Sequence, residues 1–269
     1  MIKTEKITLW PGDEDTYLES YICGNVGNFK RKALLVIPGG GYNEVCADRE
    51  GYPIAEAFLP YGYDAFVLHY SVKKKRTFPA QLIEASAAMK YIRDNAEKFG
   101  IDPAKVFAVG FSAGGHLCGS LATMWHLPEI YKEVPMEYGY NKPNGVMMIY
   151  PVVAGDKKIS HAGSFINLSG DNDPSEETLN KLSINLNVDE KTCPVFLVHT
   201  ANDSCVNVKN SLRMADACAT NKIPFELHIY PDAPHGMALC NKITNRGVEK
   251  WDNPHNEWVK EAVEWADLL

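Results

Sequence analysis

Residues 110–117 read GFSAGGHL, with Ser112 set among glycines. Glycine loses more backbone freedom on folding than any other residue, so a cluster of glycines needs a structural reason. The preceding run, KVFAVGF (105–111), is mostly apolar over a strand length, and the stretch from Ala113 to about Trp125 has a helical pattern. The sequence therefore predicts a sharp strand-to-helix turn with Ser112 at its tip.

Other short runs share this strand-like character, because each is mostly apolar and of strand length. They are ALLVIP (33–38), DAFVLHYS (64–71), NGVMMIYP (144–151), CPVFLVHT (193–200) and PFELHIYP (224–231). Runs without polar alternation indicate strands that are covered on both faces, as in a parallel sheet. The early segments ITLWPG and TYLESYI fit antiparallel strands at one edge of that sheet.

Helical patterns alternate with these strands. AQLIEASAAMKYIRDNAEKFG (80–100) spaces its apolar residues as a helix does and ends on a glycine suited to a C-cap, and further helices are expected at 208–221 and 256–269. This alternation predicts a single α/β domain over residues 1–269 with a mainly parallel sheet. A polar insert at 152–192 is expected to form a small cap over the sheet.

Composition and charge narrow the class of protein. The 269 residues are 45% hydrophobic and 23% charged, as in ordinary globular proteins, and the net charge of −7 disfavours a nucleic-acid partner. The basic run KKKR (73–76) is interpreted as a solvated loop, with a localisation signal or a polyanion contact as the weaker alternatives. No apolar run approaches a signal peptide or a membrane span, so we expect a cytoplasmic protein without a membrane partner.

The cysteines argue against disulfides and zinc. Their number is odd, their spacing is scattered and no CxxC pair occurs. They are Cys23, Cys46, Cys118, Cys193, Cys205, Cys218 and Cys240. No His/Asp/Glu cluster has metal-ligand spacing either, so we expect no metal.

The G-x-S-x-G pattern at a strand-to-helix turn is typical of a nucleophile elbow. A serine hydroxyl needs a base to take its proton and an acid to orient that base, and on such folds the three follow in the order Ser, Asp, His. Asp203 and His235 fit, because each lies just past the carboxyl end of a predicted strand. We predict that Ser112, Asp203 and His235 form a catalytic triad; a small-residue helix packed on a sheet is the structural alternative.

Three other aspartates compete with Asp203 for the role of the acid. Asp232 is only three residues from His235 on the same loop, and Asp171 and Asp173 lie in the insert. Asp203 is preferred because of its place after a strand.

The predicted strand 33–38 runs into GGGY (39–42), where three glycines allow the backbone to approach a substrate closely. We expect the N–H groups of Gly40 and Gly41 to join that of Ala113 in an oxyanion hole. A flexible turn is the alternative; a phosphate loop is disfavoured because no Gly-Lys-Ser/Thr follows.

Several residues lie beside this predicted site in the sequence and are candidates for an acyl pocket or a sugar platform. They are Tyr42, Tyr70, Tyr150, Cys205, Val206 and Met237, and simple packing is an equal alternative for each. Among the histidines, we expect His116 to make a structural hydrogen bond. His69 and His199 end predicted strands near the site and are candidates for the pocket lining, with a satisfied core histidine as the favoured alternative, and we assign no partner to His161.

Four motifs together carry a resemblance to a known superfamily. They are PGGGY (38–42), GIDPAKVFAVGFSAGGHL (100–117), HTANDSCV (199–206) and PDAPHG (231–236). The chain resembles the α/β-hydrolases over roughly residues 33–265. More narrowly, it is similar to the bacterial esterase branch of hormone-sensitive-lipase-like and acetyl-xylan-esterase-like enzymes.

The resemblance implies a Ser-His-Asp carboxylester hydrolase that needs no cofactor. Pro38 departs from the lipase-like pattern, which has a histidine before its glycines, and so favours the carbohydrate-esterase-like members. We expect hydrolysis of short-chain acyl esters, with acetylated carbohydrates among the candidate substrates. A serine peptidase of the prolyl-oligopeptidase kind and a non-catalytic binding protein on the same scaffold are the alternatives.

Overall fold

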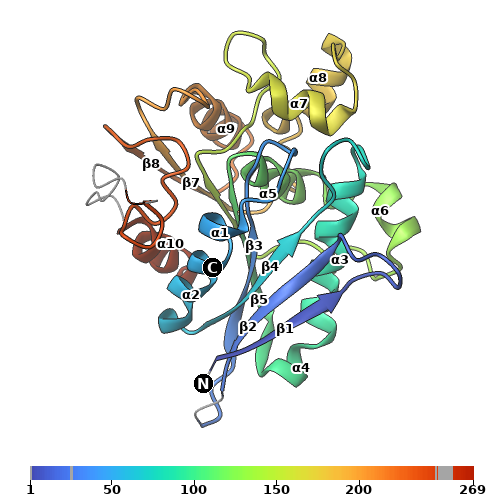
Figure 1. The fold of residues 1–269 in the computed structure, drawn as a ribbon, viewed down its shortest axis with the longest axis vertical. Coiled ribbons are helices and arrows are strands. Elements are labelled where there is room, and N and C mark those ends of the chain that lie inside the picture. The colour runs from blue at the N-terminus through green and yellow to red at the C-terminus, as the bar shows by residue number, and fades with distance from the viewer. Residues whose placement is uncertain (1, 25–26, 246, 248–256) are drawn as a thin grey trace.

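The computed structural model describes residues 2–24, 27–245, 247 and 257–269, and its centre is an eight-stranded sheet (Figure 1). The strands lie in the order β1-β2-β4-β3-β5-β6-β7-β8. They are β1 (Ile2–Thr8), β2 (Tyr17–Cys23), β3 (Arg31–Ile37), β4 (Tyr63–His69), β5 (Ile101–Phe111), β6 (Val146–Ile149), β7 (Val195–Thr200) and β8 (Phe225–Tyr230).

The sheet is parallel from β4 to β8, and antiparallel pairing is found where β2 joins β1 and β4. The predicted α/β-hydrolase fold with a mainly parallel sheet is confirmed. The edge strands were also predicted, but the first was placed too late, because β1 ends at Thr8 and the chain turns before Gly12.

Helices cover both faces of the sheet. They are α1 (Ala47–Glu50), α2 (Tyr52–Phe58), α3 (Ala80–Asp94), α4 (Ala96–Phe99), α5 (Ala113–Met124), α6 (Pro128–Glu133), α7 (Ala162–Ser169), α8 (Glu176–Leu182), α9 (Lys209–Thr220) and α10 (Trp258–Asp267), with 3-10 turns at Leu59–Tyr61 and Ile184–Leu186. Asn95 breaks the helix predicted over 80–100, and Gly100 caps the second piece at φ 72° as expected. Residue 256, where the last helix was predicted to begin, lies outside the described residues.

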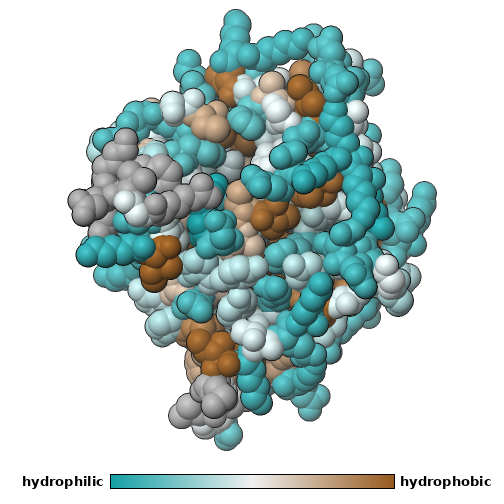
Figure 2. All heavy atoms as spheres, in the orientation of Figure 1, coloured by the Kyte–Doolittle hydropathy of each residue, from teal (hydrophilic) through white to brown (hydrophobic). Residues whose placement is uncertain are grey.

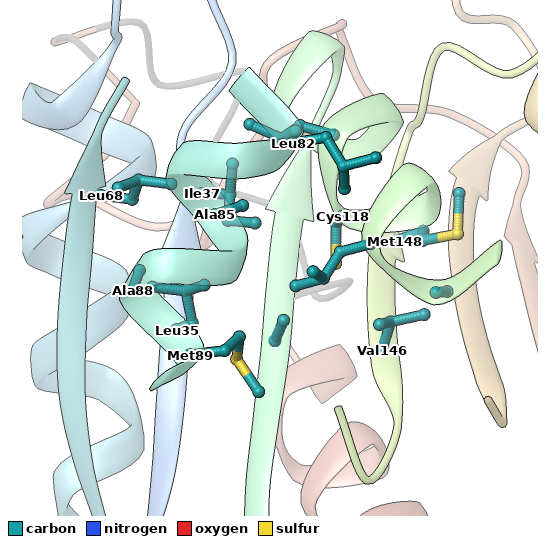
Figure 3. Close-up of a cluster of buried hydrophobic side chains, with 14 of the residues drawn as sticks. Leu35, Ile37, Leu68, Leu82, Ala85, Ala88, Met89, Cys118, Val146 and Met148 are labelled. Atoms are coloured by element: carbon teal, nitrogen blue, oxygen red, sulfur yellow. The ribbon is translucent and has the colours of Figure 1, made fainter. Parts of the chain in front are cut away.

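The core is divided between the two faces because side chains alternate along each strand. Leu35 and Ile37 of β3 pack on the face of α3 and α5, whereas Leu34 and Val36 pack on the face of α2 and α10. Figure 3 shows the first of these layers, with Leu82, Ala85, Ala88 and Met89 of α3 directed toward the sheet. This two-sided burial explains why the predicted central strands lacked polar alternation. For 224–231 the prediction of two covered faces is wrong, because β8 is an edge strand whose residues are exposed or half-buried.

The segment 152–192 carries α7 and α8, which Figure 1 shows beyond the end of the sheet toward which β4 points. Figure 2 shows a mainly hydrophilic face on which apolar side chains form separate small patches. No helix in the described part of the chain combines the length and apolar character that a bilayer crossing requires.

The turn at Ser112 depends on close backbone approaches at two glycines, Gly110 and Gly114. A Cβ on Gly110 would lie 2.3 Å from the carbonyl oxygen of Gly114, and a Cβ on Gly114 would lie 2.1 Å from that of Ile37. Both positions must therefore be small, because the first turn of α5 touches the backbone of β3 and β5.

Replacing Gly114 with alanine should therefore destabilise the protein by about 1–3 kcal/mol, the usual cost of overpacking a rigid core. The measurement is the free energy of unfolding in urea. Gly163→Ala in α7 is the matched control, since its Cβ would meet nothing nearer than 3.7 Å. Equal stability of the two variants would contradict the packing argument.

Candidate active site

Ser112 occupies the strained turn between β5 and α5. Its backbone lies at φ 52°, ψ −117°, where few residues with a side chain are found. The amide of Ser112 donates to the carbonyl of Ile149, and its own carbonyl accepts from Val152 and His116, so neighbouring segments hold the turn from both sides. The hydroxyl is thereby presented at the carboxyl end of the sheet.

The three residues predicted as a triad lie in one hydrogen-bonded chain. The Oγ of Ser112 is 2.9 Å from Nε2 of His235, and Nδ1 of His235 is 2.7 Å from Oδ2 of Asp203. His235 and Asp203 come from the loops after β8 and β7, so three strands deliver the three side chains to one place. The arrangement has the geometry of a nucleophile, its general base and an orienting acid.

The carboxyl of Asp203 is enclosed by donors. Its Oδ1 accepts from the amides of Cys205 and Val206 at 2.8 and 2.9 Å, and the buried ring of His199 lies 3.4 Å from Oδ2. Burial alone would raise the pKa of Asp203, but the contacts from His199 and His235 outweigh it and hold the pKa well below its usual range. The acid therefore stays ionised opposite His235, and His199 supports Asp203 from behind rather than entering the cleft.

None of the rival aspartates reaches His235 in this way. Asp232 is exposed and accepts from the side chain of Asn202. Asp171 and Asp173 are exposed in the insert, where the Oδ1 of Asp171 accepts from the amide of Asp173.

The GGGY loop has a conformation that only glycine adopts readily. Gly40 lies at φ 123°, and a Cβ there would be 2.1 Å from the carbonyl oxygen of Glu44. The carbonyl of Gly40 accepts from the amides of Asn43 and Glu44, so the N–H of Gly41, in the same peptide group, points away from this turn. Likewise the carbonyl of Gly39 accepts from Cys46, which directs the N–H of Gly40 to the opposite side.

The amides of Gly40, Gly41 and Ala113 donate to no protein acceptor within the described residues. Ala113 is the first residue of α5, where helix geometry leaves N–H groups free. Free amides of this kind suit the binding of a developing negative charge.

A cleft of about 290 Å³ opens above Ser112 and His235. Its walls come from the glycine loop, α1, α7 and the loop of the acid. They comprise Gly40, Gly41, Asn43, Glu44, Cys46, Arg49, Glu50, His161, Gly163, Asn167 and Cys205. The described lining contains no Leu, Ile, Val, Phe or Trp, so no long apolar side chain of this lining faces a ligand.

Most of the residues predicted to form a substrate pocket do not line this cleft. Tyr42, Tyr70, Val206 and Met237 are at most 2% exposed and pack in the core, which corrects the prediction of substrate contacts for them. The hydroxyl of Tyr70 donates to the carbonyl of Pro38, so this ring supports the glycine loop from below. Cys205 is the exception, because it does line the cleft.

Sequence reasoning missed the contribution of α7. His161 lines the cleft with its Nδ1 2.9 Å from the hydroxyl of Ser164, and the side-chain amide of Asn167 donates to the carbonyl of Gly41 at 2.9 Å. Burial, together with the nearby His235, lowers the pKa of His161 and favours its neutral form. No local motif marks these residues, since they approach the glycine loop from more than 100 positions away in the chain.

His116 makes the structural hydrogen bonds that were expected of it. Its Nδ1 is 2.9 Å from the hydroxyl of Tyr42, and its Nε2 is 2.8 Å from the carbonyl oxygen of Leu182. The ring thus links the glycine loop to the end of α8. His69, by contrast, stacks on Tyr17 of β2 and is absent from the cleft lining.

Among the described residues, no group of three or more His, Cys, Asp or Glu side chains could hold a metal ion.

Comparison with known families agrees with this fold. Residues 21–218 match the model of the BD-FAE family. The chain therefore belongs to the BD-FAE family and has the α/β-hydrolase fold.

Two solved structures match nearly the whole chain. One is an α/β-hydrolase enzyme from a deep-sea metagenome library, 32% identical, with a TM-score of 0.80 and coverage of 99% of this chain and 97% of that one. The other is an acetyl ester-xyloside bifunctional hydrolase from Caldicellulosiruptor lactoaceticus, 30% identical, with a TM-score of 0.82 and coverage of 98% and 95%.

Two longer proteins are also similar. Endo-1,4-beta-xylanase B of Butyrivibrio fibrisolvens is 37% identical over 254 residues, which are 89% of this chain and 39% of that protein. Acetylxylan esterase of Xylanibacter ruminicola is 28% identical over 252 residues, which are 92% of this chain and 48% of that protein. The chain thus spans less than half the length of each of these relatives.

Stability should fall on mild acidification because of His116. Burial lowers its pKa to about 4, whereas an unfolded histidine titrates near ~6.5. Between these values His116 binds a proton in the unfolded chain but not in the folded state. The stabilisation of the folded state by neutral His116 is therefore complete above pH 6.5 and decreases as the pH falls toward 4. This one group should lower the free energy of unfolding by about 2 kcal/mol between pH 7 and pH 5.

Urea unfolding at the two pH values measures this change. His116→Gln, which cannot take up a proton, should remove about that part of the dependence. A variant with the same pH slope as the wild type would show that other groups cause it.

Proposed function

We propose that the protein is a serine carboxylester hydrolase that removes short acyl groups, acetyl above all, from carbohydrates. The observation that carries this proposal is the hydrogen-bonded chain from Ser112 through His235 to Asp203, placed beside the free amides of Gly40, Gly41 and Ala113. Acyl transfer by a serine requires a nucleophile with its base and acid, next to preorganised N–H donors for the oxyanion.

In the proposed reaction His235 takes the proton of Ser112 while the serine oxygen attacks the ester carbonyl. The resulting oxyanion accepts hydrogen bonds from the three amides. His235 then returns the proton to the leaving alcohol, which breaks the ester bond and leaves the acyl group on Ser112. Water, deprotonated by His235, then attacks the acyl carbonyl; the bond to Ser112 breaks, His235 returns the proton to the serine oxygen, and the carboxylic acid leaves. Asp203 stabilises the charged imidazole in both halves of the reaction.

The preference for short acyl groups is supported by the walls of the cleft. A long apolar tunnel would add about 0.8 kcal/mol for each methylene that it buries. The described walls instead hold glycines and polar or charged side chains with no large aliphatic residue, and the segment 152–192, which we propose to act as a small cap, adds His161 and Asn167. The preference for carbohydrates is supported by the names of relatives, among them an acetylxylan esterase and an acetyl ester-xyloside hydrolase.

A series of 4-nitrophenyl esters from acetyl to octanoyl, assayed beside acetylated xylan oligomers, tests this function. kcat/KM should be highest for acetyl or propionyl and should decline for longer chains. Ser112→Ala is the negative control: its kcat should fall by about 10⁶-fold while the protein remains folded. A steady rise through octanoyl, or turnover that survives in the folded Ser112→Ala protein, would reject the proposal.

The choice of the acid is tested by a pair of variants. Asp203→Asn should lower kcat by about 10⁴-fold, because an asparagine favours the wrong tautomer of the histidine. Asp232→Asn, on the exposed neighbouring loop, should keep nearly full activity. The reverse outcome would assign the role to Asp232.

A further inference from the structure

Glu50, the last residue of α1, is a buried carboxylate to which the triad mechanism gives no role. It is 1% exposed, yet both of its oxygens are hydrogen-bonded. Oε2 accepts from the amide of Gly39 at 2.8 Å, and Oε1 accepts from the hydroxyl of Tyr150 at 3.0 Å. A carboxylate held by donors in the wall of a catalytic cleft is costly to bury, so its contacts indicate a specific task.

The contact with Gly39 anchors the start of the glycine loop. Gly39 immediately precedes the two residues whose amides face the cleft. A Cβ on Gly39 would lie 2.8 Å from Oε2 of Glu50 and 3.0 Å from Cβ of Ser112, so carboxylate, loop and nucleophile meet at one point. With the N–H of Gly39 bound to Glu50 and its carbonyl bound to Cys46, both polar groups of this residue are fixed.

The contact with Tyr150 reaches the opposite side of the site. The same hydroxyl that donates to Glu50 accepts from the amide of Ala238 at 3.1 Å, three residues after His235. The ring of Tyr150 also packs edge-on against the ring of His235, with centroids 5.0 Å apart. Tyr150 is fully buried, so it transmits the position of Glu50 to the loop of the base.

Arg49 contributes the opposing charge. Its Nε lies 3.5 Å from Oε1 of Glu50, and its guanidinium is near Gly236, the residue after the base. The pair therefore bridges α1 and the loop of His235 from the wall of the cleft.

We propose that Glu50 is a positioning residue that locks the glycine loop and the loop of His235 into one rigid unit. This inference rests on the proposed function, since it concerns the placement of the oxyanion donors and the base. Among the described residues, Glu50 hydrogen-bonds to Gly39 and Tyr150 and to no member of the triad. Its removal should leave substrate binding intact and impair the chemical step, because a misplacement of about 1 Å costs about 10²-fold in rate.

Glu50→Gln is the primary test. Its amide keeps the size of the side chain but replaces one acceptor oxygen by an NH2 donor, so the bond to Gly39 or the bond to Tyr150 is lost or reversed. On 4-nitrophenyl acetate we expect kcat to fall by about 10- to 100-fold while KM changes by less than threefold. The rate at which a fluorophosphonate labels Ser112 should fall in parallel, because that reaction uses the same base and donors.

Glu84→Gln is the matched control. Glu84 is also 1% exposed and accepts from the amide and the hydroxyl of Ser71 at 2.8 and 2.5 Å, with Arg76 at 3.5 Å. Like Glu50, it is a buried carboxylate that accepts from an amide and a hydroxyl and lies near an arginine. Among the described residues it has no hydrogen bond to the glycine loop or to the loop of His235. This variant should lose a similar amount of thermal stability and keep the wild-type kcat.

Tyr150→Phe supplies a second, milder disruption if Glu50→Gln does not fold. It should lower kcat with KM unchanged, and where both variants fold, the double variant should lose less than the product of the single effects. Wild-type kcat in Glu50→Gln or Tyr150→Phe, or an equal loss of kcat in Glu84→Gln, would overturn the positioning role. A wild-type protein that hydrolyses no ester would instead reject the proposed function.

Discussion

The contact between the first turn of α5 and the backbone at the end of β3 is the constraint on which the site depends. A single methyl group at Gly114 would fall within 2.3 Å of two carbonyl oxygens, so the helix reaches the sheet only without one. This approach forces the chain through the strained conformation of Ser112 and directs the free amide of Ala113 toward the same point as the serine hydroxyl. The same close packing therefore determines both this part of the core and the position of the Ser112 hydroxyl.

The sequence predicted the sheet well because its central strands are covered on both faces. Their apolar runs are unbroken, as at 33–38 and 193–200, and glycines or prolines mark their ends. The loops after the strands of Ser112, Asp203 and His235 were predicted from the same pattern, because parallel strands bring their carboxyl ends to one edge. The short helices α1, α7 and α8 were missed, since four to eight residues carry too little periodicity.

The residues around the triad were harder to predict because their positions depend on tertiary contacts. Tyr42 and Met237 adjoin active-site residues in the chain, yet they turn into the core, since large side chains next to a tight turn gain more by burial. Asn167 and Glu50 reach the glycine loop from other segments. Adjacency in sequence is thus a poor guide to which residues line the cleft. The positions of predicted strand ends are a better guide, because they brought Ser112, Asp203 and His235 together.

The hydrogen bond from Asn167 to the carbonyl of Gly41 ties the segment 152–192 to the loop that it overhangs. This segment therefore cannot be exchanged between related proteins as an independent module. A transplanted segment must bring a donor to the same carbonyl, or the recipient loop loses a restraint on its geometry. Variation in this part of the fold is consequently freest at the exposed positions of α8 and most restricted at the few positions of α7 that meet the glycine loop.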